Sequence, residues 1–274
     1  MKSTIIFARL FTTIEGTCMS TDSFPELVAI VRRLRKECPW DSQQTHESIR
    51  HHLIEETYEI VESIDQADWK ALCEELGDVL LHVVLHSIIA EETNEFRLDD
   101  VIEGISAKLV RRHPHVFGDV NVSGAEEVKQ NWEKLKMSEG RQSHLDGVPK
   151  ELPALLRAHR LQERAAKVGF DWEHGSDVWK KVEEELREFQ SALHSENREK
   201  ASEEFGDLLF SLVNYARFIK INPEMSLRKT SDKFIQRFQY IERRLKEQDK
   251  DIHAVSLAEM DALWDEAKNK QNDE

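Results

Sequence analysis

The chain has 274 residues, a length that allows about two domains. Its 53 acidic and 38 basic residues give a formal net charge of −15, and so negative a surface repels phosphate backbones and anionic lipid. General nucleic-acid binding and membrane binding are therefore disfavoured. The three cysteines, Cys18, Cys38 and Cys73, have no C-x-x-C spacing, which argues against disulfides and a cysteine zinc site and favours a cytoplasmic protein.

Residues 1–18 are expected to be an N-terminal extension, disordered or not naturally translated. A lysine at position 2 precedes a short apolar run, but Arg9 interrupts that run and Glu15 follows. No stretch reaches the roughly 20 apolar residues that a membrane span requires. A weak targeting segment is the alternative.

The first half then shows helical periodicity. Apolar residues from Phe24 to Val31 begin it, and a second stripe contains Ile49, Leu53, Ile60, Val61 and Ile64. Residues 65–68 are typical of a turn, with Asp68 as N-cap of a third helix, whose stripe runs from Leu72 to Val84. A later helix carries Lys108 and Arg112 and should end before Pro114.

A glycine- and proline-containing segment, residues 137–153, is the predicted linker. Beyond it the pattern repeats, with apolar stripes from Val182 to Leu193 and from Phe205 to Leu212 on either side of a polar turn at 195–197. Because no credible strand pattern occurs, we predict an all-α fold of two tandem helical-hairpin halves, each a four-helix-type bundle completed by dimerisation. The predicted domains span residues 19–136 and 154–274.

Two acidic clusters show that the halves are a duplication. Each has the pattern EExxE followed 16 residues later by ExxD, and the second lies 129 positions after the first. The first cluster has Glu55, Glu56, Glu59, Glu75 and Asp78, and the second has Glu184, Glu185, Glu188, Glu204 and Asp207.

The spacing of these carboxylates indicates a metal site. Residues three apart share a helix face, and a 16-residue gap fits two antiparallel helices, so four carboxylates should converge in each half. Unpaired carboxylates at close range repel one another and need cations. Oxygen ligands without cysteine or histidine favour Mg²⁺, with Mn²⁺ as a substitute. The alternative is that both clusters are solvated helix faces.

Histidines and one tryptophan near the clusters are interpreted as structural. His82 corresponds to Ser211, so a shared metal role is disfavoured, and we interpret His82 as a helix-packing residue. Trp40, in a Cys-Pro-Trp-Asp motif with no counterpart at the common offset, is most simply a core residue, with an accessory role at the site as the alternative.

Basic and aromatic residues in the second half favour a polyphosphate ligand. Lys181 and Lys200 each lie one turn before a carboxylate of the cluster. Lys233 and Arg237 form a second cationic pair, and Trp264 offers an aromatic plane for a base. P-loop, Rossmann and serine-hydrolase motifs are absent from the sequence. The set fits a nucleoside triphosphate.

Seven motifs in order, CPWD, LIEETYE, EELGDVLL, RRHPHVFGD, VGFDW, VEEELRE and EEFGDLLF, resemble the MazG family of all-α nucleoside triphosphate pyrophosphohydrolases. The resemblance runs from about Phe24 to Lys268. It implies a Mg²⁺-dependent homodimer that hydrolyses nucleoside triphosphates to monophosphate and pyrophosphate, with broad base tolerance and a housecleaning role.

By position, the resemblance implies four metal ligands in the second half, Glu185, Glu188, Glu204 and Asp207. The implied nucleotide contacts are Lys181, Lys200, Lys233, Arg237 and Trp264. The first half retains Glu56, Glu59, Glu75, Asp78, Lys108, Arg112 and Trp132, but has His52 and Ala71 where the second half has Lys181 and Lys200.

We therefore expect catalysis in the second half, with in-line attack of water on the α-phosphorus and Glu184 as a residue that orients or deprotonates the water. Two alternatives stay open: a narrower all-α pyrophosphatase acting on dUTP or phosphoribosyl-ATP, and a non-catalytic acidic helical scaffold.

Overall fold

The computed structural model describes residues 23–272, apart from 126, 129–130, 133–134, 136–141 and 196. The predicted extension, residues 1–18, lies outside this part of the chain. Every regular element within the described residues is helical, which confirms the predicted all-α fold. Contacts divide the chain into two compact units, Met1–Asn121 and Val122–Glu274. Among the described helices, none combines the length and apolar character needed to cross a membrane.

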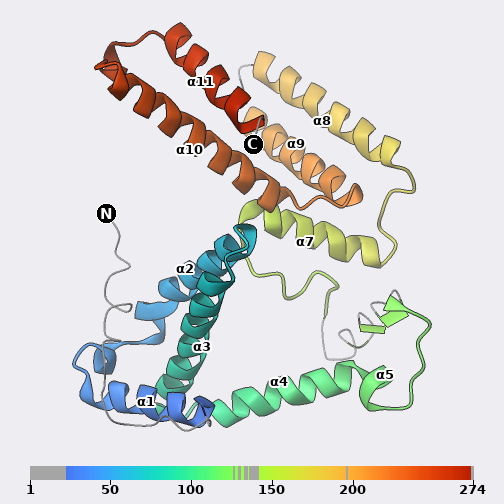
Figure 1. Cartoon of the computed structure of the whole chain (residues 1–274). Coiled ribbons are helices and arrows are strands. Elements are labelled where there is room, and N and C mark those ends of the chain that lie inside the picture. Colours follow the sequence, from blue (N-terminus) through green and yellow to red (C-terminus); the bar gives the residue numbers. More distant parts are fainter. Residues whose placement is uncertain are drawn as a thin grey trace. The chain divides into compact units, whose positions relative to one another are not determined.

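The first unit is built on a long helical hairpin (Figure 1). Its elements are α1 (Ser23–Glu37), η1 (Asp41–Gln43), α2 (His46–Asp65), α3 (Trp69–Glu92), α4 (Leu98–Arg112) and α5 (Pro114–Phe117). Helix α2 packs along α3, α1 crosses α3, and α4 leads away from the hairpin.

Local chemistry sets the hairpin boundaries. The Thr45 hydroxyl accepts the N–H of Ser48, and the Ser48 hydroxyl accepts the N–H of Thr45, so a capping box begins α2. Asp68 accepts the N–H groups of Lys70 and Ala71, which confirms the predicted N-cap of α3. Ala67, at φ 54°, takes the left-handed conformation that the tight turn requires.

The core of the first unit lies where α1, α2 and the C-terminal half of α3 meet. Its buried members are Val31, Ile49, Val84, Leu85, Ile88, Ile89 and Leu98. Arg35 of α1 donates two hydrogen bonds of 2.8 Å to the carboxylate of Glu92, which ties α1 to the end of α3. This bidentate pair fixes the far end of the hairpin and leaves the other end for the acidic residues.

The second unit repeats the hairpin and adds flanking helices (Figure 1). Its described helices are α7 (Ala154–Lys167), α8 (Gly175–His194), α9 (Arg198–Phe218), α10 (Pro223–Glu247), η2 (Ile252–Ala254) and α11 (Leu257–Asn272). Helix α8 packs along α9, α7 contacts α9, and α10 contacts α11. Asn197 caps α9 by accepting the N–H of Lys200, as Asp68 caps α3.

The predicted apolar stripes are only partly buried. Val84 and Val182 belong to the interior, but Leu76 of α3 is 52% exposed and its counterpart in α9, Phe205, is 47% exposed. The next residues along the same two faces are also exposed: Leu80, Val83, Leu209 and Leu212. Both hairpins therefore present an apolar face that the helices of their own unit leave open.

Candidate metal and nucleotide site

The second hairpin brings its predicted carboxylates together. Helix α8 presents Glu185 and Glu188 one turn apart, and α9 presents Glu204 and Asp207. Carboxylate oxygens of Glu185, Glu204 and Asp207 lie within 4.8 Å of one another, as do those of Glu184, Glu185 and Glu188. Glu185 is the most enclosed, at 7% exposed, whereas Asp207 faces solvent. One side of the cluster is therefore open to a ligand.

Lys181 lies at the edge of this cluster, as the spacing predicts. Its Nζ is 2.7 Å from a carboxylate oxygen of Glu184 and 2.7 Å from one of Glu185. These two ion pairs raise the pKa of Lys181 and lower that of Glu184. The ammonium group is thus already aimed at the enclosed carboxylate.

Lys200 approaches the cluster from the other helix. It lies on the exposed first turn of α9, and its positive charge acts on Glu204. The pKa of Glu204 is nevertheless raised, by loss of hydration and then by the negative charge of Glu188. The carboxylates therefore repel one another despite the two lysines.

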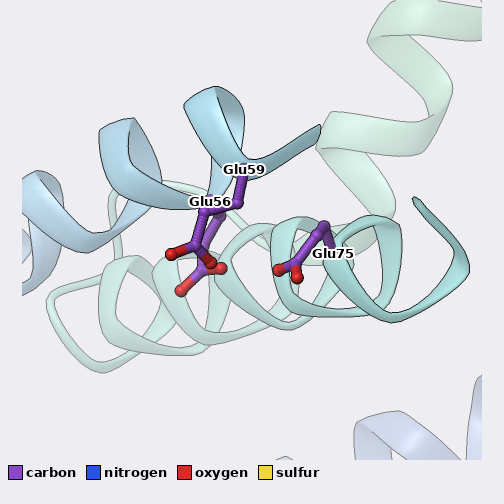
Figure 2. Close-up of side chains that lie close together, drawn as sticks. All are labelled: Glu56, Glu59 and Glu75. Atoms are coloured by element: carbon purple, nitrogen blue, oxygen red, sulfur yellow. The ribbon is translucent and has the colours of Figure 1, made fainter. Parts of the chain in front are cut away.

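The first hairpin forms an equivalent cluster (Figure 2). Figure 2 shows Glu56 and Glu59 extending from α2 toward Glu75 on α3, and oxygens of these three residues lie within 4.8 Å of one another. Burial raises the pKa of Glu56 to about 7, with further contributions from the negative charges of Asp78, Glu59 and Glu75. Glu75 and Asp78 also have raised pKa values, again mainly through burial.

The two hairpins differ in the cation beside the cluster. At the position of Lys181 the first unit has His52, whose Nδ1 is 3.1 Å from an oxygen of Glu55, the counterpart of Glu184. Histidine supplies a full positive charge only when protonated, and at the position of Lys200 the first unit has Ala71. The first unit therefore retains a side-chain contact to the first glutamate of its cluster, Glu55, but it lacks the permanent positive charge that Lys181 supplies in the second unit.

The remaining predicted contacts lie on other helices. Arg237 of α10 stacks over Trp264 of α11, with Cζ 5.4 Å from the ring centroid, and Phe234 contacts the same ring. Lys233 is exposed on α10. This group belongs to the α10–α11 pair, whereas the carboxylates belong to α8–α9, so the nucleotide-binding roles of Lys233, Arg237 and Trp264 stay predictions.

The first-half equivalents are also separated from their carboxylates along the chain. Lys108 and Arg112 lie in the last two turns of α4, the helix that leads away from the hairpin (Figure 1). Trp132 is half-buried and belongs to the part of the chain that groups with the second unit.

The position of Trp40 favours the alternative interpretation of this residue, an accessory role at the site. Trp40 is 43% exposed, so its interpretation as a core residue is wrong, and its indole lines a pocket beside Glu56 and Asp78. His82 also lines this pocket. The Cys-Pro-Trp-Asp motif was the sequence feature that could have indicated this position. Its tryptophan comes directly before η1 and α2, so it lies close to the α2–α3 hairpin that carries the carboxylates.

The glycines beside the acidic pairs do not mark close helix packing. A Cβ atom built on Gly77 or Gly206 would meet no atom within 4 Å among the described residues. The open space at both positions leaves room for a ligand or for a partner chain.

The residues present fit a hard divalent cation. Each cluster offers only carboxylate oxygens, which are preferred ligands of Mg²⁺ and Mn²⁺, and no cysteine or histidine belongs to the clusters found among the described residues. Burial first, and neighbouring negative charges second, raise the pKa values of Glu56, Glu75 and Asp78, and a bound cation would stabilise the charged form of each carboxylate.

Comparison with known proteins gives the same organisation. The sequence model of the MazG nucleotide pyrophosphohydrolase domain matches residues 44–117 and again residues 175–241, which contain the two hairpins. A nucleoside triphosphate pyrophosphohydrolase/pyrophosphatase MazG of Thermotoga maritima is 44% identical over 250 residues, covering 89% of this chain and 95% of that protein.

Two further relatives cover most of the chain. The nucleoside triphosphate pyrophosphohydrolase of Escherichia coli K12 is 40% identical over 256 residues, covering 90% of this chain and 97% of that protein. The uncharacterized protein YabN of Bacillus subtilis is 52% identical over 257 residues, which is 90% of this chain but 52% of YabN. With two matched domains, and with the Thermotoga and Escherichia relatives covered almost end to end, this chain belongs to the MazG nucleotide pyrophosphohydrolase family.

Proposed function

We propose that the chain hydrolyses nucleoside triphosphates to nucleoside monophosphate and pyrophosphate, and that the second hairpin is the catalytic unit. The observation that carries this assignment is the combination of a four-carboxylate cluster with two permanent cations, Lys181 and Lys200, at its edge. Family membership and the printed activity of the Thermotoga and Escherichia relatives support the reaction.

The carboxylates would hold Mg²⁺ or, as a substitute, Mn²⁺. Glu185, Glu188, Glu204 and Asp207 would be the ligands, and the bound cation would offset phosphate charge and lower the pKa of a coordinated water. The same role is proposed for Glu56, Glu59, Glu75 and Asp78 in the first unit.

The side chains around the cluster have separate tasks in this proposal. Lys181, held 2.7 Å from Glu185, and Lys200 on the facing helix bind oxygens of the triphosphate and offset its charge, which the acidic chain otherwise repels. Glu184 is exposed and paired with Lys181 alone among the ion pairs described, so it is free to orient the attacking water when Lys181 turns to the phosphates. Lys233, Arg237 and Trp264 complete nucleotide binding.

Product analysis tests the reaction. With α-³²P-labelled nucleoside triphosphate and Mg²⁺, the full chain should release labelled monophosphate and unlabelled pyrophosphate. Labelled diphosphate would instead indicate cleavage at the γ-phosphate, and absence of products with every divalent cation would favour the acidic scaffold. A panel with the four ribonucleotides, dUTP and phosphoribosyl-ATP separates a broad enzyme from a narrow one by kcat/KM.

The open apolar faces favour a homodimer. Leu76 and Phe205 occupy equivalent positions beside Gly77 and Gly206, where nothing in the described chain approaches. A second copy of the chain that covers these faces would complete each hairpin as a four-helix bundle. Sedimentation equilibrium should give twice the chain mass, and Leu80→Glu with Leu209→Glu should shift the equilibrium toward the monomer.

A further inference from the structure

The pocket beside the first-unit carboxylates has features that metal binding leaves unexplained. Ile49, Leu81 and Leu85 line it with apolar side chains, and Trp40, which is 43% exposed, lines it with an aromatic one. Glu56 and Asp78 border the same space. An apolar slot with an accessible indole next to a phosphate-binding cluster has the chemistry of a site for a flat heteroaromatic ring.

His82 adds an unsatisfied polar group to this slot. The residue is 8% exposed, it lines the pocket, and its Nδ1 has no hydrogen-bond partner among the described residues. Burial lowers the pKa of His82, so the neutral ring offers one N–H donor and one acceptor nitrogen. A buried group without a partner costs about 1–3 kcal/mol, a cost that a hydrogen-bonding ligand removes.

The second unit lacks this arrangement. The residue equivalent to His82 is Ser211, whose hydroxyl already donates to the Leu208 carbonyl at 2.8 Å, and the Cys-Pro-Trp-Asp motif that carries Trp40 has no counterpart at the common offset. The slot is therefore a property of the first hairpin and not of the duplicated fold.

We infer that the first unit is a base-selective nucleotide site, in which the base stacks on Trp40 and hydrogen-bonds to His82. The inference rests on the proposed function to the extent that Glu56, Glu59, Glu75 and Asp78 hold the phosphates through Mg²⁺. The first unit thereby discriminates among bases, while the second acts on the triphosphate irrespective of the base. Sites that hydrogen-bond a ligand through a buried group reject analogues lacking the matching group far more strongly than apolar slots do.

Equilibrium binding measures this directly. The substitutions Glu185→Ala and Glu204→Ala are introduced into the full chain to disable the second site. Isothermal titration calorimetry with Mg²⁺ then measures the binding of α,β-methylene triphosphates of adenine, guanine, cytosine and uracil. One nucleotide should bind per chain, with Kd values spread at least about tenfold between the best and worst base, which is about 1.4 kcal/mol.

Four variants made in this doubly substituted chain, one of them a control, separate the contributions of Trp40 and His82. Trp40→Ala should weaken all four analogues by about tenfold or more, because stacking on an aromatic side chain contributes about 1–3 kcal/mol per base. Trp69→Ala, which removes a more exposed tryptophan at the start of α3, should leave every Kd unchanged. His82→Leu should reduce the spread among bases to less than about threefold, and His82→Gln, which keeps a hydrogen-bonding group, should retain a spread with a changed order.

These measurements separate failure of the base-selective site from failure of the proposed function. An unchanged base ranking in His82→Leu, or unchanged affinity in Trp40→Ala, overturns the inference, and calorimetric unfolding of each variant establishes that it is folded. If the first unit binds no analogue while the unmodified chain still releases pyrophosphate, the inference fails and the proposed function stands. If the unmodified chain neither binds the analogues nor releases pyrophosphate, the proposed function fails.

Discussion

The two hairpins carry the same carboxylates in different electrostatic settings. In the second unit Lys181 pairs with Glu184 and Glu185, whereas in the first unit a histidine at the same place pairs with Glu55. Burial, and then the neighbouring carboxylates, raise the pKa of Glu56 to about 7. Duplication thus preserved the cluster and changed its counter-charge. A repeated ligand pattern does not by itself identify the catalytic unit, because the cations around it decide how much of the charge of a bound triphosphate is offset.

The largest expected effect is loss of a second-unit carboxylate. Glu185→Ala or Asp207→Ala should lower kcat/KM for nucleoside triphosphates by at least about a hundredfold, because each removes a charged ligand from the proposed metal cluster. Removal of one of several repelling charges should leave the melting temperature of the metal-free protein unchanged or raised. Steady-state kinetics and calorimetry measure both, and near-normal turnover in either variant would contradict the metal-site assignment.

Lys181 provides the next test. Lys181→Ala should raise KM and lower kcat, with a combined loss of about tenfold or more, because it removes a charge-assisted contact to the triphosphate. The matched control is Lys180→Ala, which removes an exposed lysine paired with Asp177 on the same helix and should retain full activity. Equal losses in the two variants would show that net charge, and not the position of Lys181, is what matters.

The pH dependence of the metal-free protein distinguishes the hairpins. The folded pKa of Glu56, about 7, lies above its ordinary value, so the folded first unit binds an extra proton and its stability falls as pH rises through 7. In EDTA the melting temperature should therefore decline between about pH 5 and pH 8.

Glu56→Gln should remove much of that decline, and Mg²⁺ should restore stability at pH 8. Glu62→Gln, on the exposed side of the same helix, is the control and should keep the decline. A melting temperature that rises over the same range in the unmodified protein would contradict the charge assignment.

The smallest effect is expected when the lysine of the second unit is introduced at the equivalent position of the first unit. His52→Lys gives the first unit the residue that the second unit has, and an ammonium beside Glu55 and Glu56 should move the pH midpoint of the stability decline downward. His51→Lys, one position away, should move it less. Identical shifts would show that long-range charge alone accounts for the difference between the hairpins.

The sequence predicted the architecture well because its signals were local and repeated. Helical periodicity, Asp68 as an N-cap and Pro114 as a break each depend on a few neighbouring residues, and all three are present in the structure. The family and its reaction class, inferred from the ordered motifs, are confirmed by the two matched domains and the relatives. The convergence of the carboxylates followed from spacing because two antiparallel helices leave few alternatives.

Features that depend on tertiary packing could not be predicted as well from the sequence. Apolar stripes indicated Leu76 and Phe205 as buried, but helical period cannot say whether the covering surface comes from the same chain. The exposed position of Trp40 depends on the path of η1 in front of α2, and no sequence period records that path. The nucleotide contacts expected of Lys233 and Arg237 were equally beyond reach, since the position of α10 relative to the carboxylates depends on its tertiary contacts with α7 and α9.

The most direct test of the account is a kinetic comparison of two double variants of the full chain. Glu56→Ala with Glu59→Ala should leave most nucleoside triphosphate hydrolysis intact, whereas Glu185→Ala with Glu188→Ala should abolish release of pyrophosphate. Both variants remove two carboxylates from equivalent positions, so each is the matched control of the other. If the first-unit variant is inactive and the second-unit variant works, the lysines do not identify the catalytic unit and the central claim is wrong.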